Sequence, residues 1–223
     1  PPQLSATASL LMDHHSGRVL VEHNANARVE PASITKIMTS YVAFHALRND
    51  SIQLDDEVRI SKNARYKHTD GSRMFIEYNS LVSVEDLLKG VIIQSGNDAS
   101  IALAEHIAGS EESFTNLMNR HARSLGMQDT HFTNSTGWPD ENHYTTAADL
   151  AKLARALIND FPEEYAMFSE RRFTHNDIQQ SNRNRLLWLD DRVDGIKTGH
   201  TESADYCLVS SAQDEGMRLI AVV

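Results

Sequence analysis

The two ends of the chain carry short apolar runs separated by turn residues. At the N-terminal end the runs cover residues 8–12 and 19–21, and a His-Ser-Gly turn lies between them at 15–17. At the other end, residues 206–211 and 218–223 alternate in polarity around an Asp-Glu-Gly turn and are rich in β-branched side chains. Runs of this kind around a turn are typical of β-hairpins. The sequence therefore predicts strands at both ends.

The middle of the chain has apolar residues spaced three and four apart, as in helices that bury one face. Ser83 opens a pattern of capping-box form, and Ser110 and Thr146 precede two further helical patterns as N-caps. The helices predicted in this way run from Pro31 to Asn49, from 84 to about 94, from 97 onward, over 111–125 and over 147–158. The simplest arrangement is an α/β fold of the α+β type. It has one antiparallel sheet, built from both chain ends and flanked by this central helical cluster.

Composition restricts the possible classes of protein. The 223 residues are 40% hydrophobic and 23% charged, as in a folded domain and unlike a disordered chain. The 31 acidic and 21 basic residues give a net charge of −10, which argues against a nucleic-acid partner. Cys207 is the single cysteine, and the 11 histidines are scattered without a zinc motif, so we expect no metal and no cofactor. No apolar run is long enough to span a bilayer.

Three short elements carry side chains with catalytic chemistry. They are Ser33-Ile34-Thr35-Lys36, Ser95-Gly96-Asn97 and Lys197-Thr198-Gly199. A serine and a lysine three residues apart on a helix share one face, so the lysine amine can act as the base for the serine hydroxyl. Ser-x-x-Lys alone is a weak signal. The three elements in this order are the pattern of class A β-lactamases and penicillin-binding proteins, although those proteins have Ser-Asp-Asn at the second element.

The longer segments around these elements extend the similarity, and they cover residues 31–41, 94–99, 182–188 and 193–201. In these segments the chain resembles the low-molecular-mass penicillin-binding proteins that are serine-type D-alanyl-D-alanine carboxypeptidases. The resemblance implies one β-lactamase/transpeptidase-like catalytic domain over residues 1–223. It also implies a bacterial source and export to the periplasm or the outer face of the cytoplasmic membrane. Family members usually add a C-terminal β domain and a membrane-anchoring helix. We expect both to be absent from this chain, so that membrane contact occurs only through a segment outside it.

The resemblance assigns catalytic roles to four residues. Ser33 is the nucleophile that attacks the carbonyl between two D-alanines of a peptidoglycan stem peptide, and Lys36 accepts its proton. Ser95 relays a proton to the leaving amine, from a joint between two helices where Gly96 is expected to permit the turn. Asn97 holds the substrate amide and Lys36, with simple helix capping as the alternative.

Further residues are expected to bind the substrate. By resemblance, Lys197 and Thr198, expected at the start of an edge strand, bind its terminal carboxylate, and Gly199 lets its backbone come close. The backbone N–H groups of Ser33 and His200 form the oxyanion hole. Arg183 is a second candidate for the carboxylate, with a solvated surface arginine as the alternative.

The sequence thus predicts a D,D-carboxypeptidase that trims pentapeptide stems ending in D-Ala-D-Ala, is acylated and inhibited by β-lactams, and needs no cofactor. The alternatives are a D,D-endopeptidase of the same superfamily and a non-enzymatic β-lactam-sensing domain. A β-lactamase is disfavoured because no Glu-x-x-x-Asn element occurs where a deacylating glutamate is expected. We expect Trp138 and Trp188 to belong to the core and not to substrate subsites.

Overall fold

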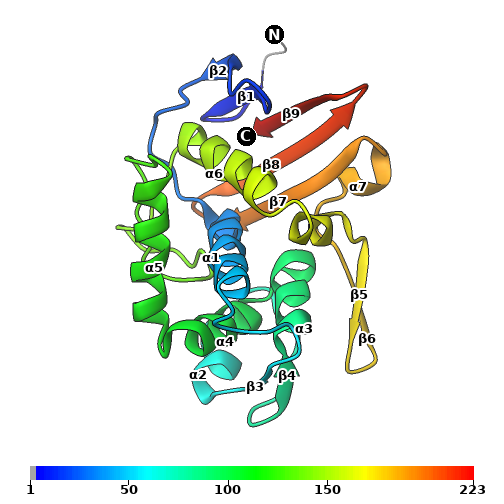
Figure 1. The fold of residues 1–223 in the computed structure, drawn as a ribbon. Helices are drawn as coiled ribbons and strands as arrows, with labels where there is room; N and C mark the ends of the chain where they lie inside the picture. The colour runs from blue at the N-terminus through cyan, green and yellow to red at the C-terminus, as the bar shows by residue number, and fades with distance from the viewer. Residues whose placement is uncertain (1–3) are drawn as a thin grey trace.

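Five antiparallel strands join the two ends of the chain in one sheet (Figure 1). The computed structural model describes residues 4–223. The strand order β2-β1-β9-β8-β7 places the N-terminal hairpin beside the C-terminal strands, so the predicted topology is confirmed. The strands are β1 (Ser9–Asp13), β2 (Val19–His23), β7 (Val193–Thr201), β8 (Asp205–Asp214) and β9 (Met217–Val222). Because β7 is the last strand, one of its edges is free to border a site.

Two further sheets have only two strands each, and the sequence pattern did not reveal them. β3 (Glu57–Arg59) pairs with β4 (Leu81–Ser83), and β5 (Arg172–His175) pairs with β6 (Ile178–Ser181). Strands of three or four residues are too short for period-two alternation to stand out from the surrounding polar sequence. The β5–β6 hairpin matters for the site, because β6 leads into the segment that carries Arg183.

The predicted helices are present, but irregular turns replace the α-helix at residues 32–35 and 90–94 within two of them. Side-chain oxygens of Ser83, Ser110 and Thr146 each accept a backbone N–H three residues later, which confirms all three N-caps. The α-helices are α1 (Lys36–Arg48), α2 (Lys62–Tyr66), α3 (Val84–Lys89), α4 (Asn97–Ala108), α5 (Glu111–Ser124), α6 (Ala147–Asp160) and α7 (Leu186–Leu189). The irregular turns are a 3₁₀ turn η1 (Ala32–Thr35) before α1 and a π turn η2 (Gly90–Gln94) after α3; a second 3₁₀ turn, η3, covers Glu164–Ser169.

Helix α1 lies at the centre of the molecule and is buried on nearly every face (Figure 1). It packs against α4, α5 and α6, and its first turns approach β7. Ile37, Met38 and Phe44 are fully buried, and burial of one such side chain contributes about 1.5–3 kcal/mol. Polar side chains on a helix enclosed in this way are costly unless they have hydrogen-bond partners. Lys36 at its start is therefore fixed in position by its surroundings.

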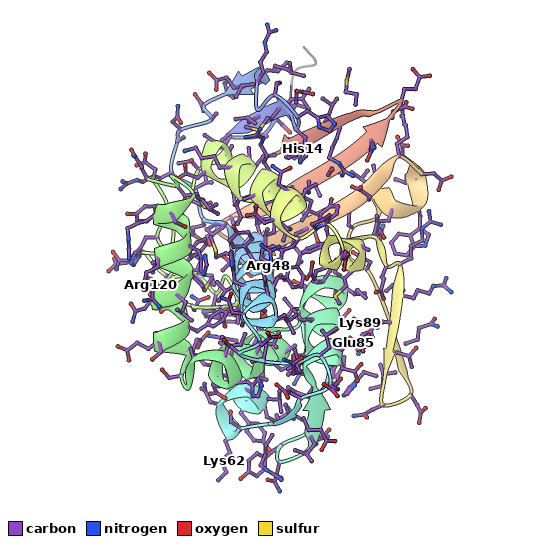
Figure 2. The ribbon with its side chains drawn as sticks, viewed as in Figure 1. His14, Arg48, Lys62, Glu85, Lys89 and Arg120 are labelled. Carbon is purple, nitrogen blue, oxygen red and sulfur yellow. The ribbon has the colours of Figure 1, made fainter. Side chains whose placement is uncertain are left out.

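Charged side chains project from the outer faces of the helices, as Figure 2 shows for Lys62 on α2 and Arg120 on α5. On α3, Lys89 donates to Glu85 one turn earlier at 2.7 Å. Such half-exposed pairs contribute a few tenths of a kcal/mol. Within residues 4–223, no helix combines the length and the hydropathy needed to cross a bilayer.

The two tryptophans differ from the prediction. Trp188 is 40% exposed on α7, and Trp138 is only partly buried, with its ring stacked on His68 at a centroid distance of 4.3 Å. Neither belongs to the core, so the prediction that both would is wrong. The core around α1 is filled instead by Phe44, Phe161 and Phe168.

Candidate active site

Ser33 and Lys36 meet at the start of α1. Ser33 is half-buried in the 3₁₀ turn η1, Lys36 is the first residue of the helix, and their Oγ and Nζ atoms lie 3.1 Å apart. The spacing of three residues has this effect because successive turns stack their side chains on one face. Just before the serine, Ala32 has φ +46°, in the left-handed region that non-glycine residues rarely adopt. Strain of this kind recurs at residues held for function.

The amine of Lys36 is enclosed by three oxygen atoms. Besides the hydroxyl of Ser33, it donates to Asn97 Oδ1 at 2.8 Å and to the carbonyl of Thr136 at 2.6 Å. Lys36 is 1% exposed, so it is not a solvated surface lysine. Burial, helped by the nearby Lys197 cation and opposed by Asp98, holds the pKa of Lys36 well below its ordinary value.

This geometry suits a neutral amine as a proton acceptor. A neutral lysine amine has two N–H groups and one lone pair. If Asn97 and the Thr136 carbonyl accept the two N–H groups, the lone pair faces Ser33 Oγ. The same three contacts then hold a base directed at the hydroxyl of a nucleophile.

Ser95 and Asn97 occupy the joint between η2 and α4, as predicted, but the glycine between them has a different role. Ser95 itself takes the left-handed conformation at φ +65°, whereas Gly96 has an ordinary φ of −62°. A Cβ on Gly96 would lie 2.8 Å from Asp98 Oδ1 and 3.1 Å from the backbone nitrogen of Met74. Gly96 is therefore needed for close approach and not for the turn. Asn97 makes no side-chain cap at α4, since its Oδ1 accepts from Lys36.

Asp98 secures this joint from behind. Its buried carboxylate accepts backbone N–H groups from residues 74–76 and from Ala99, at 2.9–3.3 Å. The backbone of Asn97 also donates to the carbonyl of Ser72 at 2.7 Å. Together these bonds fix the 72–76 segment against the start of α4, so the position of Asn97 does not depend on its own side chain.

Lys197 approaches the same joint from the sheet. Its amine donates to Ser95 Oγ and to the carbonyl of Thr198, each at 2.9 Å, and the side chain is 2% exposed. Burial and the neighbouring Arg183 cation lower the pKa of Lys197 to about 7. The lysine lies in the middle of β7 and not at its start, which corrects the prediction.

Gly199 lets β7 pack against η1, the turn that carries Ser33. A Cβ at this position would lie 3.1 Å from the carbonyl oxygen of Pro31 and 3.2 Å from the backbone nitrogen of Ile34. These distances are shorter than ordinary van der Waals contacts, so a side chain at this position would require β7 or η1 to shift by a few tenths of an ångström. Gly199 therefore sets the distance between the sheet edge and Ser33.

A cleft of about 1290 Å³ opens where these elements meet. Its lining includes Ser33, Ser95, Thr198, Gly199, His200 and Arg183. The opposite walls come from residues 70–72 and from β6 with the segment 182–186 that follows it. Lys36, Asn97 and Lys197 are buried behind this lining. Lys36 bonds to Ser33 and to Asn97, and Lys197 bonds to Ser95.

Two predicted residues lie at the rim of the cleft. Arg183 is exposed and acts on Lys197 through its charge, and the guanidinium has no ion pair within residues 4–223. His200 is also exposed, with its ring tilted over Tyr206 at 4.3 Å between centroids. Neither side chain bonds directly to Ser33, Lys36 or Ser95 in the described part of the chain.

The loop that supplies the third acceptor of Lys36 was not predicted from the sequence. The carboxamide oxygen of Asn134 accepts the backbone N–H groups of residues 136, 137 and 138, which curls the loop so that the Thr136 carbonyl faces Lys36. Asn-Ser-Thr-Gly at 134–137 is recognisable as a turn, but a backbone carbonyl has no residue-type signature. Gly137 at φ +81° packs its backbone against the carbonyl of Ala32.

The same loop carries a buried histidine that holds the other side of η1. His143 Nδ1 accepts the backbone N–H of Thr133 at 3.1 Å, so the ring proton is on Nε2 and is donated to Thr35 Oγ1 at 2.8 Å. Burial lowers the pKa of His143 to about 4, and the ring is therefore neutral at pH 7. Within residues 4–223 no group of three His, Cys, Asp or Glu side chains could hold a metal ion.

A hydroxyl beside a buried lysine, joined to Ser-x-Asn and Lys-Thr-Gly elements on this α+β fold, defines the class of active-site serine proteins that includes penicillin-binding proteins and class A β-lactamases. Within that class, the chain belongs to the D-alanyl-D-alanine carboxypeptidase family, peptidase family S11, whose profile matches residues 1–223. The resemblance and the fold predicted from the sequence are thereby confirmed.

Individual relatives agree with this assignment. D-alanyl-D-alanine carboxypeptidase DacC of Escherichia coli is 52% identical over all of this chain and 57% of its own length. A D-alanyl-D-alanine endopeptidase of the same organism is 31% identical over 93% of this chain and 67% of that protein. DacC is the more similar of these two relatives. The chain spans well under two thirds of the length of DacC.

Solved structures match equally well. Penicillin-binding protein 5 from Haemophilus influenzae superposes with a TM-score of 0.98 at 47% identity, over all of this chain and 66% of that one. Penicillin-binding protein D2 from Listeria monocytogenes, in its ampicillin-bound form, gives a TM-score of 0.89 at 29% identity over all of this chain and 91% of that one.

Proposed function

We propose that this domain is a serine D-alanyl-D-alanine carboxypeptidase, which removes the terminal D-alanine from peptidoglycan stem pentapeptides and is acylated by β-lactams. The observation that carries the proposal is the position of Lys36, buried and within 3.1 Å of Ser33 Oγ, with two further acceptors to orient its amine. A relative at 52% identity is named for this activity, and a structural neighbour has been solved with ampicillin bound.

Substrate binding begins with the terminal carboxylate. Lys197 and Thr198 would bind it at the sheet edge, and Arg183 adds a second positive charge at the rim. The scissile carbonyl then lies over Ser33, where the backbone N–H groups of Ser33 and His200 form the oxyanion hole. Gly199 keeps the strand close enough to the serine for both groups to serve one oxygen.

Acylation then proceeds in three proton transfers. The lone pair of Lys36 takes the hydroxyl proton as Ser33 Oγ forms a bond to the carbonyl carbon. Because Lys197 donates to Ser95 Oγ, the hydrogen of that hydroxyl is left for another acceptor. Ser95 can give it to the leaving amine as the C–N bond breaks. Ser95 then recovers a proton from the Lys36 ammonium group, which leaves Lys36 neutral. D-Alanine departs and the peptide remains as an ester on Ser33.

Hydrolysis of the ester completes the cycle. Lys36, neutral again, takes a proton from a water molecule that attacks the ester carbonyl, and the proton passes to Ser33 Oγ as the ester bond breaks. The same amine thus serves as base in both halves of the reaction. A β-lactam would enter by the first half, because opening its ring leaves the same kind of ester on Ser33.

The proposed place of action follows from the substrate. Stem peptides are assembled into the wall outside the cytoplasmic membrane, so we propose the periplasm or the outer face of that membrane, in a bacterium like those that contain the relatives. We propose contact with the membrane only through a C-terminal segment outside this chain.

The function is tested by incubating the domain separately with a stem pentapeptide, with a cross-linked muropeptide dimer and with a penicillin. We expect free D-alanine from the pentapeptide, and none with Ser33→Ala. Cleavage of the dimer alone would indicate an endopeptidase. A persistent penicillin adduct without any release of D-alanine would indicate a sensing domain. Either of the last two results would contradict the proposal.

A further inference from the structure

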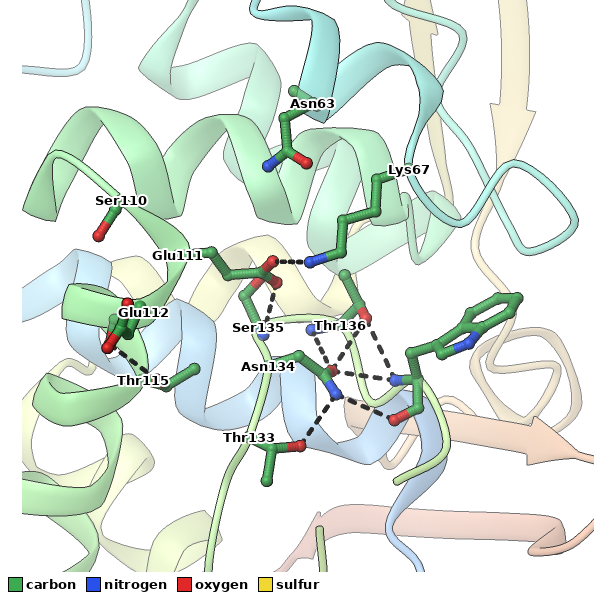
Figure 3. A network of polar contacts seen from close by, with 12 residues as sticks. Asn63, Lys67, Ser110, Glu111, Glu112, Thr115, Thr133, Asn134, Ser135 and Thr136 are labelled. Atoms are coloured by element: carbon green, nitrogen blue, oxygen red, sulfur yellow. Dashed lines mark hydrogen bonds and ion pairs between the residues drawn. The ribbon is translucent and has the colours of Figure 1, made fainter. Parts of the chain in front are cut away.

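A buried carboxylate outside the cleft connects two segments that surround Lys36. Glu111 is the first residue of α5, and its side chain is 9% exposed. One carboxylate oxygen accepts the backbone N–H of Ser135 at 3.0 Å and its hydroxyl at 2.7 Å, and the other accepts from Lys67 Nζ at 2.6 Å (Figure 3). The carboxylate therefore joins the 134–138 loop to the segment that follows α2.

Ser135 is held on both sides by these contacts. Its carbonyl accepts the hydroxyl of Thr39, on α1, at 2.7 Å, while Glu111 holds its N–H and its hydroxyl. The next residue is Thr136, whose carbonyl accepts from Lys36. A shift of Ser135 would therefore move the Thr136 carbonyl relative to the lysine amine.

The second connection leads to the other acceptor of Lys36. Lys67 begins the segment 67–72, in which Gly71 packs its backbone directly against the side-chain amide of Asn97. The ring of His68 stacks on Trp138 in the same region. Both acceptors that orient the lysine, Asn97 Oδ1 and the Thr136 carbonyl, thus border segments that Glu111 holds.

The charge of Glu111 is consistent with this role. Burial would raise the pKa of the carboxyl group, but the hydrogen bonds from Lys67 and Ser135 outweigh it and hold the pKa below its ordinary value. The carboxylate also lies at the N-terminus of α5, where the helix dipole favours a negative charge. It is ionised at neutral pH and accepts from all of its partners.

We propose that Glu111 is a positioning residue for the Lys36 base, which fixes Ser135 so that the Thr136 carbonyl stays on the lysine amine. Glu111 contacts neither Ser33 nor Lys36, so its effect is transmitted through the loop. The inference rests on the proposed function, because it presumes that Lys36 is the base for acylation of Ser33.

Two conservative variants separate the effect of the position of the Glu111 carboxylate from the effect of its charge. Glu111→Gln keeps an oxygen in position to accept from Ser135 but loses the charge. Glu111→Asp keeps the charge but withdraws the carboxylate by one methylene. The measurement is the second-order rate of acylation by a fluorescent penicillin between pH 5 and 9. We expect Glu111→Gln to stay within about threefold of the wild-type plateau, and Glu111→Asp to fall by about 10- to 100-fold.

The pH profile distinguishes positioning from a loss of stability. A carbonyl acceptor favours the protonated lysine. In Glu111→Asp, loss of the Thr136 contact should therefore move the rising limb of the profile to lower pH as the plateau drops. A variant that was merely less stable would melt earlier but keep the wild-type midpoint and plateau in its folded fraction.

Glu105 provides a matched control. It is a half-buried carboxylate on α4 that accepts from Ser61 and Asn63 at 2.6 and 2.8 Å, and it has no hydrogen bond to the 134–138 loop. We expect Glu105→Gln and Glu105→Asp to leave both plateau and midpoint unchanged. The inference is overturned if Glu111→Asp acylates like wild type, or if Glu111→Gln loses the rate while Glu111→Asp keeps it. If the wild-type protein is not acylated on Ser33, the proposed function itself has failed.

Discussion

Lys197 donates to Ser95 Oγ across 2.9 Å, although 102 residues separate them in the chain. This bond joins the edge of the sheet to the joint between η2 and α4, and the cleft opens along the line between these two parts. In the proposed mechanism this bond supports the role of Ser95 as a donor, because a hydroxyl that accepts from an ammonium group can donate its own hydrogen to the leaving amine.

The first prediction concerns the charge of Lys197. Burial lowers its pKa to about 7, so the free enzyme loses this cation as the pH rises through neutrality. A substrate with a free terminal carboxylate should then show a bell-shaped kcat/KM profile. It should rise as Lys36 becomes neutral and fall above about pH 7 as Lys197 loses its proton.

A C-terminally amidated substrate provides the comparison. It cannot pair with the ammonium group, so we expect kcat/KM to be about 10- to 100-fold lower at pH 7, which is the effect of a charged hydrogen bond of about 1.5–3 kcal/mol. The falling limb should also be weaker. Equal rates for the two substrates at pH 7 would show that Lys197 does not bind the carboxylate.

The second prediction compares two glycines with positive φ. Gly137 and Gly109 have φ of +81° and +78°, so alanine is strained by about 1–2 kcal/mol at either position. A Cβ on Gly109 meets nothing within 4 Å, whereas one on Gly137 would overlap the carbonyl of Ala32. In urea denaturation we expect Gly109→Ala to lose about 1–2 kcal/mol and Gly137→Ala at least about 3 kcal/mol. If the two variants lost a similar free energy of unfolding, the backbone of Gly137 would not pack closely against the carbonyl of Ala32.

The third prediction concerns acid stability through His143. Its pKa is about 4 in the folded protein and about 6.5 when exposed, so the unfolded chain binds more protons between these values. The contribution of the neutral ring to stability is complete above about pH 6.5 and is lost as the pH falls through 4.

His143→Gln keeps an amide donor for Thr35 but does not titrate. Between pH 7 and 4.5, the wild-type protein should lose about 2–3 kcal/mol more of its free energy of unfolding than the variant does. The other histidines titrate in both proteins and cancel in the comparison. If both proteins lost the same amount, His143 would not be the source of the acid sensitivity.

Much of the fold could be predicted from the sequence because its signals are local. The Ser83, Ser110 and Thr146 caps and the terminal hairpins follow from a few neighbouring residues, and the structure has all of them. The three motif elements predicted the residues that gather around the cleft, since residue type and spacing indicate their chemistry. Short strands such as β3 and β5 were missed because three or four residues carry too weak a pattern.

The remaining parts of the site depend on the backbone and on contacts between distant segments. The carbonyl of Thr136 serves as an acceptor because Asn134 curls its loop, and no side chain at 136 indicates this. The left-handed residue of the Ser95 joint proved to be the serine and not Gly96, since the glycine is required by packing against Met74 and Asp98. Such requirements arise from the tertiary fold and leave no periodic pattern in the sequence.

The central claim is that Lys36 takes the proton from Ser33. It is tested by the second-order rate of acylation by penicillin for wild type and Lys36→Arg across pH 5–10, with peptide mapping to locate the adduct. Arginine keeps the charge but cannot lose a proton in this range.

The wild-type rate should rise as Lys36 loses its proton, well below pH 10, because burial lowers the pKa of Lys36. It should fall again above about pH 7, because penicillin also carries a carboxylate and Lys197 loses its charge there. The adduct should be on Ser33. Lys36→Arg should be slower by about 100- to 10 000-fold, the usual contribution of a general base, and thermal melting should show that it remains folded. Lys36→Met, which leaves no cation at this position, should be equally slow. A Lys36→Arg variant that acylates within about tenfold of wild type would contradict the account, because another group would then be accepting the proton.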